Sequence, residues 1–269
     1  MKAEKEQQAA EDSSLYLEQV MEGERLDQGE LLGDAANIMM DQTKRLMGIV
    51  VEYRELMMMY TCAMKEIRTK FDVLNTEFKV RYQRNPINAI TTRLKSTASI
   101  TDKLARQGNA FTVASVEKNL RDVAGVRVIC CYIDDIYTIA DALLQQDDIT
   151  LVARKDYIAN PKPNGYRSLH LIVKVPVFFA EQRRDMTVEV QIRTIAMDFW
   201  ASLEHQLKYK HDIPNQQEIV AQLQHCAELI HATDRKMLAL RQKIELAEVN
   251  PSEEELLLEK LERLDFRFD

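Results

Sequence analysis

A continuous apolar run from Arg127 to Tyr132 (RVICCY) constrains the fold of this 269-residue chain more than any other segment. A short run of this kind predicts a strand that is buried on both faces and covered by other elements. Helical periodicity follows near 134–146 and 195–209, and further strands are predicted near 150–158, 168–177 and 186–194. Strands interleaved with helices predict an α+β domain around a mixed, mostly buried β-sheet.

Long amphipathic helices are predicted on both sides of this domain. Apolar residues recur at steps of three and four within 34–82 and again from Val220 to Ile244, and Asn85-Pro86 and Pro214 interrupt the helical pattern. Ser252 and Glu255 form a capping box that opens a last helix. These stripes offer more apolar surface than one small domain requires, so oligomerisation and packing within the chain both remain open.

The predicted organisation has three parts. Residues 1–33 form a polar leader, either mobile or a short helix, residues 34–212 form the central domain with its N-terminal helix, and residues 213–269 form C-terminal helices that favour oligomerisation.

Composition limits the function classes that fit this chain. The formal net charge of −7 gives no sign of general nucleic-acid binding, so an anionic substrate must meet a local cluster drawn from the 36 Lys and Arg residues. The four cysteines show no CxxC or metal-like spacing, which fits a reducing cytoplasm. Neither a signal peptide nor a membrane-spanning run of about 18 apolar residues is visible, so a cytoplasmic location is expected.

The segment from Lys155 to His170 (KDYIANPKPNGYRSLH) contains the densest group of unusual residues. Two prolines and one glycine predict a rigid, irregular loop. Cations at Lys162 and Arg167 accompany Tyr166, whose ring could stack on a base. An ordinary surface turn explains the same residues.

The strand Thr187–Thr194 alternates sharply. Its apolar residues point one way, whereas Glu189, Gln191 and Arg193 point the other way. A solvent-facing sheet surface explains this pattern, and so does a catalytic floor that carries an ionisable carboxylate. Two weaker clusters are Arg93-Leu94-Lys95, followed by Ser99 and Lys103, and Asp122 with Arg127 five residues later.

Taken together, these clusters resemble the synthetase domain of the RelA/SpoT family, in particular its stand-alone small alarmone synthetases. The matching segments are NPINAITTRLKSTASITDKL, DVAGVRVICCYIDDIY, DYIANPKPNGYRSLH and VEVQIRTIAMDFWASLEHQLKYK, within roughly residues 70–210. The resemblance implies a nucleotidyltransferase-like fold and an enzyme that moves the β,γ-pyrophosphate of ATP to the 3′-hydroxyl of GDP or GTP.

The resemblance also implies a role for each matching residue. Asp122 and Glu189 would hold Mg²⁺, and Glu189 would act as the base. The residues implied to bind ATP are Arg93, Lys95, Ser99 and Arg127. Those implied to bind the GDP or GTP acceptor are Lys162, Tyr166, His170 and Asp198. Further residues implied to line the site are Asn164, Arg167, Gln191, Arg193 and His205.

One position departs from the family pattern, and several alternatives stay open. Asp198 stands where several relatives carry Asn, which leaves the acceptor preference open. Some relatives transfer pyrophosphate to the 3′ end of tRNA; the net charge argues mildly against this, whereas the basic string Lys208, Lys210 and His211 favours it. A non-catalytic nucleotide- or RNA-binding regulator would be expected to lack Asp122 or Glu189. The resemblance further implies a homotetramer and leaves open an allosteric alarmone.

Overall fold

The computed structural model describes the backbone of residues 2–208 and 216–248 and the side chains of residues 39–207 and 218–246. The chain divides into two compact units, Met1–Leu56 and Met57–Asp269. Helix α1 (Lys2–Tyr82) supplies the whole first unit and the start of the second. The sequence predicted one long helix from residue 34 and left residues 1–33 open between a mobile leader and a short helix. The helix begins earlier because single glycines cost about 1 kcal/mol each without ending a helix, and no proline precedes Pro86.

In the first unit, most described apolar side chains of α1 are exposed, and Leu56 at its end is buried. Leu46, Ile49 and Val50, which belong to the predicted stripe, are 64%, 46% and 54% exposed. In the second unit the same helix turns apolar side chains into the core, where Ile67 and Phe71 are fully buried. Asn75 accepts a hydrogen bond from the backbone N–H of Ile87, which fixes the end of the helix at the start of the sheet.

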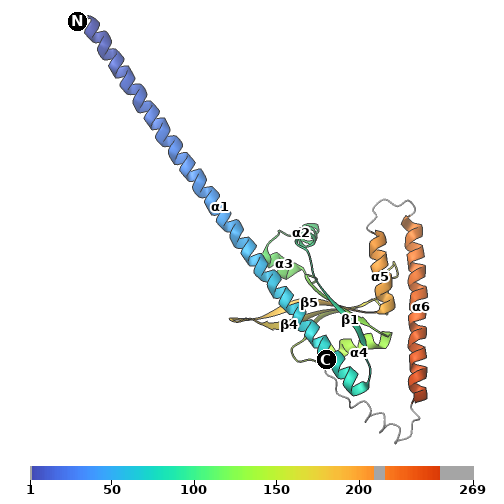
Figure 1. The fold of residues 1–269 in the computed structure, drawn as a ribbon. Coiled ribbons are helices and arrows are strands. Elements are labelled where there is room, and N and C mark those ends of the chain that lie inside the picture. Colours follow the sequence, from blue (N-terminus) through green and yellow to red (C-terminus); the bar gives the residue numbers. More distant parts are fainter. Residues whose placement is uncertain (1, 209–215, 249–269) are drawn as a thin grey trace. The chain divides into compact units, whose positions relative to one another are not determined.

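The second unit is built around a five-stranded mixed sheet with strand order β1-β2-β5-β4-β3. Figure 1 shows this sheet, with β1, β4 and β5 labelled. The strands are β1 (Ile87–Leu94), β2 (Ala124–Cys130), β3 (Thr150–Asp156), β4 (Leu169–Phe178) and β5 (Arg183–Thr194). Strands β2 and β5 run parallel at the centre, and all other neighbouring strands are antiparallel. The expectation of an α+β fold with a mixed sheet is confirmed.

The two faces of the central strands differ as the alternation predicted. Val188, Val190 and Ile192 on β5 are fully buried, as is Val128 on β2. Helix α4 (Ile133–Leu144), whose Ile136, Ile139 and Leu143 side chains are buried, packs against β2 and β5. The opposite face carries the polar side chains of the site.

Three elements were not predicted from the sequence: β1, α2 (Thr97–Arg106) and α3 (Val113–Asn119). Strand β1 is mostly exposed and lacks a buried apolar run, so its sequence carries little periodic signal. The two helices are short, and each begins at a capping hydroxyl, Ser96 for α2 and Thr112 for α3. Together, β1 and α2 form one side of the site.

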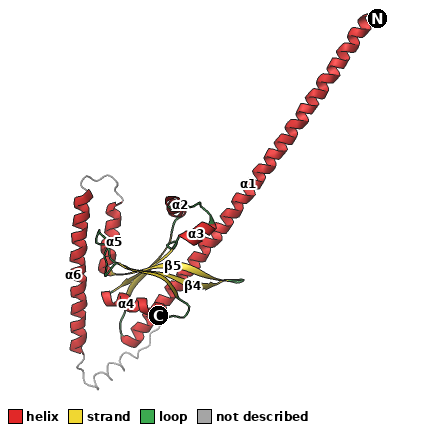
Figure 2. Cartoon of the chain, turned by 180° about the vertical axis from the view of Figure 1, so that it is seen from behind, coloured by secondary structure: helices red, strands yellow, loops and turns green. Residues whose placement is uncertain are grey.

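Helices α5 (Ile195–Lys208) and α6 (Gln216–Glu248) lie side by side at one end of the sheet (Figure 2). The Trp200 indole N–H donates to the Leu223 carbonyl oxygen over 2.9 Å. The Thr194 hydroxyl donates to the buried Asp234 carboxylate over 2.6 Å, which joins the end of β5 to α6. The helix predicted after Ser252 lies outside the described residues. Within the described part of the chain, no helix is long and apolar enough to cross a membrane.

Candidate active site

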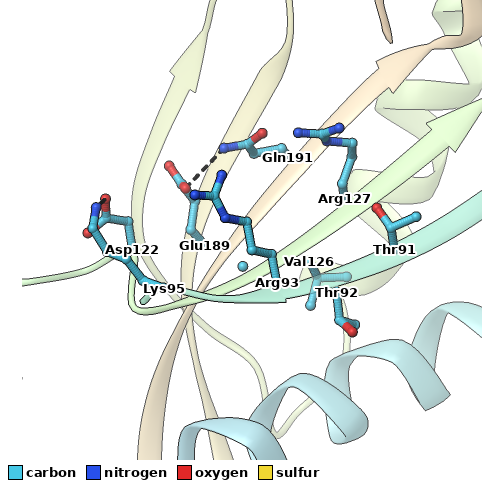
Figure 3. A pocket seen from close by; sticks show the side chains of 10 residues that line it. Thr91, Thr92, Arg93, Lys95, Asp122, Val126, Arg127, Glu189 and Gln191 are labelled. Atoms are coloured by element: carbon cyan, nitrogen blue, oxygen red, sulfur yellow. Dashed lines mark hydrogen bonds and ion pairs between the residues drawn. The ribbon is translucent and has the colours of Figure 1, made fainter. Parts of the chain in front are cut away.

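A pocket of about 480 Å³ opens on the polar face of the sheet, where β1, β2 and β5 meet (Figure 3). Its lining residues are Thr91, Thr92, Arg93, Lys95, Asp122, Gly125, Val126, Arg127, Glu189 and Gln191. Figure 3 shows Glu189 between the Asp122–Lys95 pair on one side and Gln191 with Arg127 on the other. The structure therefore brings together residues from three of the predicted clusters.

Gly125 keeps the floor of this pocket open. It pairs with Arg93 on β1 and with Glu189 on β5, so it lies between the two side chains in the sheet. A Cβ atom at this position would lie 3.4 Å from the Arg93 carbonyl oxygen, at the tight end of van der Waals contact. The missing side chain leaves space between a cation and a carboxylate.

Asp122 lies between two lysines at one end of the pocket. Lys95 Nζ and Lys103 Nζ are each 2.8 Å from Asp122 Oδ2. Burial alone would raise the pKa of Asp122, but the hydrogen bonds from Lys103 and Lys95 outweigh it and hold the pKa below the usual value. The other oxygen, Oδ1, is buried and has no hydrogen-bond partner among the described residues. Asp122 is therefore an ionised carboxylate with one oxygen left to coordinate a ligand.

Glu189 is held by a donor on each oxygen. His170 Nδ1 lies 3.3 Å from Oε1, and Gln191 Nε2 donates to Oε2 over 3.0 Å. Burial raises the pKa of Glu189, but the hydrogen bond and charge of His170, together with Gln191, bring it below the usual value. Glu189 is thus ionised at neutral pH and can accept a proton.

These contacts belong to a closed ring of side chains that includes Arg193. The Arg193 guanidinium donates to the Tyr166 hydroxyl over 3.1 Å and to Gln191 Oε1 over 2.7 Å. The Tyr166 hydroxyl lies 2.9 Å from His170 Nε2, on the side of the imidazole opposite Glu189. His170 therefore bridges the Glu189 carboxylate and the Tyr166 hydroxyl through its two ring nitrogens.

An aromatic cluster lies beside this ring. Tyr157, Tyr166 and His170 meet edge to face, with ring centroids 5.2–6.1 Å apart. Lys162 Nζ lies 4.8 Å from the centroids of both tyrosine rings. The rigid loop predicted from the sequence thus presents a cation over two aromatic rings. This arrangement is suited to a nucleotide, which offers a base for stacking and a phosphate for the cation.

Asp198, in the first turn of α5, connects the two halves of the site. Its Oδ1 accepts from Arg127 Nη1 over 3.3 Å and from Arg193 Nη1 over 3.2 Å. Arg127 lines the pocket, whereas the Arg193 side chain is only 3% exposed. One carboxylate oxygen therefore joins a pocket residue to the buried ring.

Nine predicted residues lie outside the pocket lining. Five of them belong to the contacts described above: Lys162, Tyr166, His170, Arg193 and Asp198. The other four have separate contacts or positions. Asn164 donates to Glu204 on α5 over 3.0 Å and so fixes the loop rather than the floor. Arg167 donates to the Ile158 carbonyl oxygen over 2.8 Å and lies in a small cavity with Trp200 and His231. Ser99 contacts the Ser96 hydroxyl at the start of α2, and His205 is an exposed residue of α5.

Two residues in contact with the site were given no role from the sequence. Lys103 appeared only as a member of a weak cluster, and its spacing of four residues from Ser99 places both on one helix face. Tyr157 was overlooked, although an aromatic residue between a predicted strand and the rigid loop was the available signal. The side chains of Lys208, Lys210 and His211 lie outside the described residues.

The two pocket carboxylates fit a magnesium ion better than a structural transition-metal site. In the described part of the chain, no group of three or more His, Cys, Asp or Glu side chains could hold a metal. Mg²⁺ instead uses one or two carboxylates together with phosphate oxygens and water. Asp122 Oδ1, which is buried and unbonded within the described residues, is suited to such a contact.

Comparison with known proteins agrees with this geometry. A family model described as the region found in RelA / SpoT proteins matches residues 92–214. GTP pyrophosphokinase YwaC of Bacillus subtilis is 41% identical over 208 residues, which cover 77% of this chain and 97% of that protein.

Two solved structures from the same organism are also similar. The small alarmone synthetase 2 structure is 41% identical, with a TM-score of 0.64 over 71% of this chain and 99% of its own. The small alarmone synthetase 1 structure, bound to its product pppGpp, is 35% identical, with a TM-score of 0.63 over 69% and 94% of the two chains. The protein therefore belongs to the RelA/SpoT family, among its small alarmone synthetases.

Proposed function

We propose that this protein is a GTP pyrophosphokinase, which transfers the β,γ-pyrophosphate of ATP to the 3′-hydroxyl of GDP or GTP. The observation that carries the proposal is Glu189, an ionised carboxylate held by His170 and Gln191 on the floor of a pocket lined by cations. The name of the relative YwaC and the pppGpp-bound structure of small alarmone synthetase 1 support the same activity.

ATP is assigned to the pocket end where β1, β2 and α2 meet. Arg93 and Arg127 line the pocket and offer planar guanidinium groups that can stack on a base. Lys95 and Lys103 converge within 2.8 Å of Asp122 and provide positive charge for a polyphosphate. Ser99, one turn before Lys103 on α2, is assigned to the phosphates as well.

The acceptor nucleotide is assigned to the aromatic cluster beside Glu189. Tyr166 offers a ring for stacking on guanine, with Lys162 4.8 Å from its centroid. His170 contacts both Tyr166 and Glu189, which supports an acceptor site next to the proposed base. Asp198 is assigned to guanine as a hydrogen-bond acceptor, and His205, two turns later on α5, to the rim of this region.

The proposed chemistry forms one P–O bond, breaks another, and moves one proton. The acceptor 3′-oxygen bonds to the β-phosphorus of ATP, the bond from that phosphorus to the α-phosphate oxygen breaks, and AMP leaves with the electron pair. Glu189 accepts the hydroxyl proton. Since charge builds on oxygens that are already anionic, lysine and arginine side chains supply much of the stabilisation. Mg²⁺, which Asp122 and Glu189 would hold, neutralises phosphate charge when bound.

A transfer assay with ATP labelled in the β-phosphate tests this function. GDP, GTP and tRNA are offered separately, and label is followed into the acceptor. Label in GDP or GTP is the expected result and also measures which nucleotide is preferred. Label in tRNA alone would replace the nucleotide acceptor with the tRNA alternative, and transfer to none of them would contradict the proposal.

We also propose that the protein is a homo-oligomer, in keeping with the homotetramer that the family resemblance implies. Exposed apolar side chains line one side of α6, with Met237, Leu240 and Ile244 between 50% and 58% exposed. They adjoin an apolar groove that also contains Ile195 and Phe199 of α5. Light scattering after size exclusion measures the oligomeric state, and a monomer at micromolar concentration would contradict this assignment.

A further inference from the structure

Asp198 holds two arginines that belong to different parts of the site. Its Oδ1 lies 3.3 Å from Arg127 Nη1 and 3.2 Å from Arg193 Nη1, although Arg127 is on β2 and Arg193 is on β5. Within the described part of the chain, this is the one side-chain hydrogen bond that the Arg127 guanidinium makes, so it sets the direction of that group. Asp198, which does not line the pocket, therefore determines where the Arg127 guanidinium points.

The second arginine cannot move independently of the acceptor side. Arg193 is 3% exposed, and its guanidinium also donates to the Tyr166 hydroxyl and to Gln191 Oε1. Burial lowers the pKa of Arg193, and the nearby charge of Arg127 lowers it further, whereas Asp198 opposes both effects. Without the Asp198 carboxylate, two guanidinium groups of like charge would face each other with no anion between them.

We propose that Asp198 is a positioning residue that couples the two nucleotide sites, so that acceptor binding at Tyr166 strengthens ATP binding at Arg127. This inference rests on the proposed function. A nucleotide stacked on Tyr166 orders the tyrosine hydroxyl and with it Arg193. Arg193 then holds Asp198 Oδ1 in place, and Asp198 holds Arg127 toward the ATP pocket. Since binding linkage is reciprocal, ATP must strengthen acceptor binding by the same factor.

The experiment measures this coupling directly in the full-length protein. Isothermal titration with an α,β-methylene analogue of ATP, in which the bond to be broken is replaced, gives its Kd with and without saturating GDP. The ratio of the two values is the coupling factor. The coupling factor does not report a direct contact of Asp198 with guanine. Such a contact changes only the affinity for GDP, and saturating GDP compensates for a weaker affinity.

The variants are Asp198→Asn, which keeps the shape and removes the charge, and Asp198→Ala. We expect GDP to tighten ATP-analogue binding about fivefold or more in the unmodified protein. In both variants the factor should fall toward one. Asp141→Asn removes the same charge at an exposed position of α4 that is remote from the pocket, and it should leave the factor unchanged.

Three outcomes are distinguished. A coupling factor that survives in Asp198→Asn and Asp198→Ala overturns the inference and leaves the proposed function standing. A factor of one in the unmodified protein, with both nucleotides bound, overturns it as well. Failure of the unmodified protein to bind either nucleotide contradicts the proposed function itself.

Discussion

The Arg193 guanidinium is joined to the Glu189 carboxylate by two separate chains of hydrogen bonds, each of which ends on a different oxygen. One runs through Tyr166 and His170 to Oε1, and the other runs through Gln191 to Oε2. Along the chain through Gln191, each donor points toward Glu189. Arg193 can therefore stabilise the ionised form of Glu189 from a distance.

The first prediction concerns pH dependence in His170→Ala. A base must be ionised to act, and the pKa of Glu189 lies below its usual value because the His170 and Gln191 contacts outweigh burial. Without His170, burial dominates and the pKa rises, so the acid side of the kcat/KM profile should move to higher pH. The kcat/KM profiles of the unmodified protein and of His170→Ala, measured in the same buffers, check this. Protonation of ATP affects both profiles equally and so does not produce a difference between them. An unchanged acid side would show that His170 does not act on Glu189.

The second prediction concerns the rigid loop. Gly165 has φ +88°, and a Cβ atom there would lie 2.5 Å from the Ala227 side chain on α6. Gly165→Ala should therefore lower Tm and raise the KM for the acceptor. Gly108→Ala is the matched control, because Gly108 has φ +71° but nothing within 4 Å of the added atom. The control should lose only the backbone term of about 1–2 kcal/mol.

Both glycine variants are measured by thermal unfolding and steady-state kinetics. Gly165→Ala should be the less stable of the two, and Ala227→Gly should partly rescue it because the clashing atom is removed. Equal stability losses in the two glycine variants would mean that contact with α6 does not hold the loop.

The third prediction concerns the buried carboxylate of Asp234, which is 5% exposed and accepts a hydrogen bond from Thr194. Burial raises the pKa of Asp234 above its usual value, although the Thr194 hydrogen bond opposes this. A raised folded-state pKa means that the group contributes most to stability below its unfolded-state pKa. That contribution is lost as pH rises through the folded-state value.

Asp234→Asn should therefore stabilise the protein at pH 7.5 by on the order of 1 kcal/mol, because a neutral amide oxygen can still accept from Thr194. The gain should shrink as pH falls, since the carboxyl of the unmodified protein then becomes protonated. The measurement is chemical denaturation from pH 7.5 down through the folded-state pKa of Asp234, with Asp141→Asn as the control. A loss of stability at pH 7.5 would show that the ionised form is favoured in the fold.

The sequence predicted the central part of the sheet well. The alternation in β5 follows from burial of one face, and the apolar run in β2 follows from burial of its consecutive residues Val128–Cys130, so each leaves a signal in the sequence. Glu189 could be singled out for the same reason, as the carboxylate on the polar face of a half-buried strand. The elements that carry Arg93 and Lys103 were missed because β1 is largely exposed and α2 is short.

The pairing of Asp122 could not be predicted by any local rule. Its two lysine partners precede it by 27 and 19 residues, and they reach it only because β1 and α2 pack beside the start of β2. Arg167 shows that residues of one sequence motif need not contact the same site. It belongs to the same motif as Tyr166, but adjacent side chains point in different directions, and Arg167 contacts the Ile158 carbonyl oxygen and the cavity below α6.

The central claim is that Glu189 is the base for transfer from ATP to the guanosine nucleotide, and Glu189→Gln tests it most directly. The amide keeps the shape of the side chain but cannot take the proton, so transfer of labelled pyrophosphate to GDP or GTP should fall by about 10²-fold or more. Binding of the ATP analogue should survive, and Glu181→Gln, an exposed charge removal between β4 and β5, should retain activity. Near-normal transfer by Glu189→Gln would contradict the account.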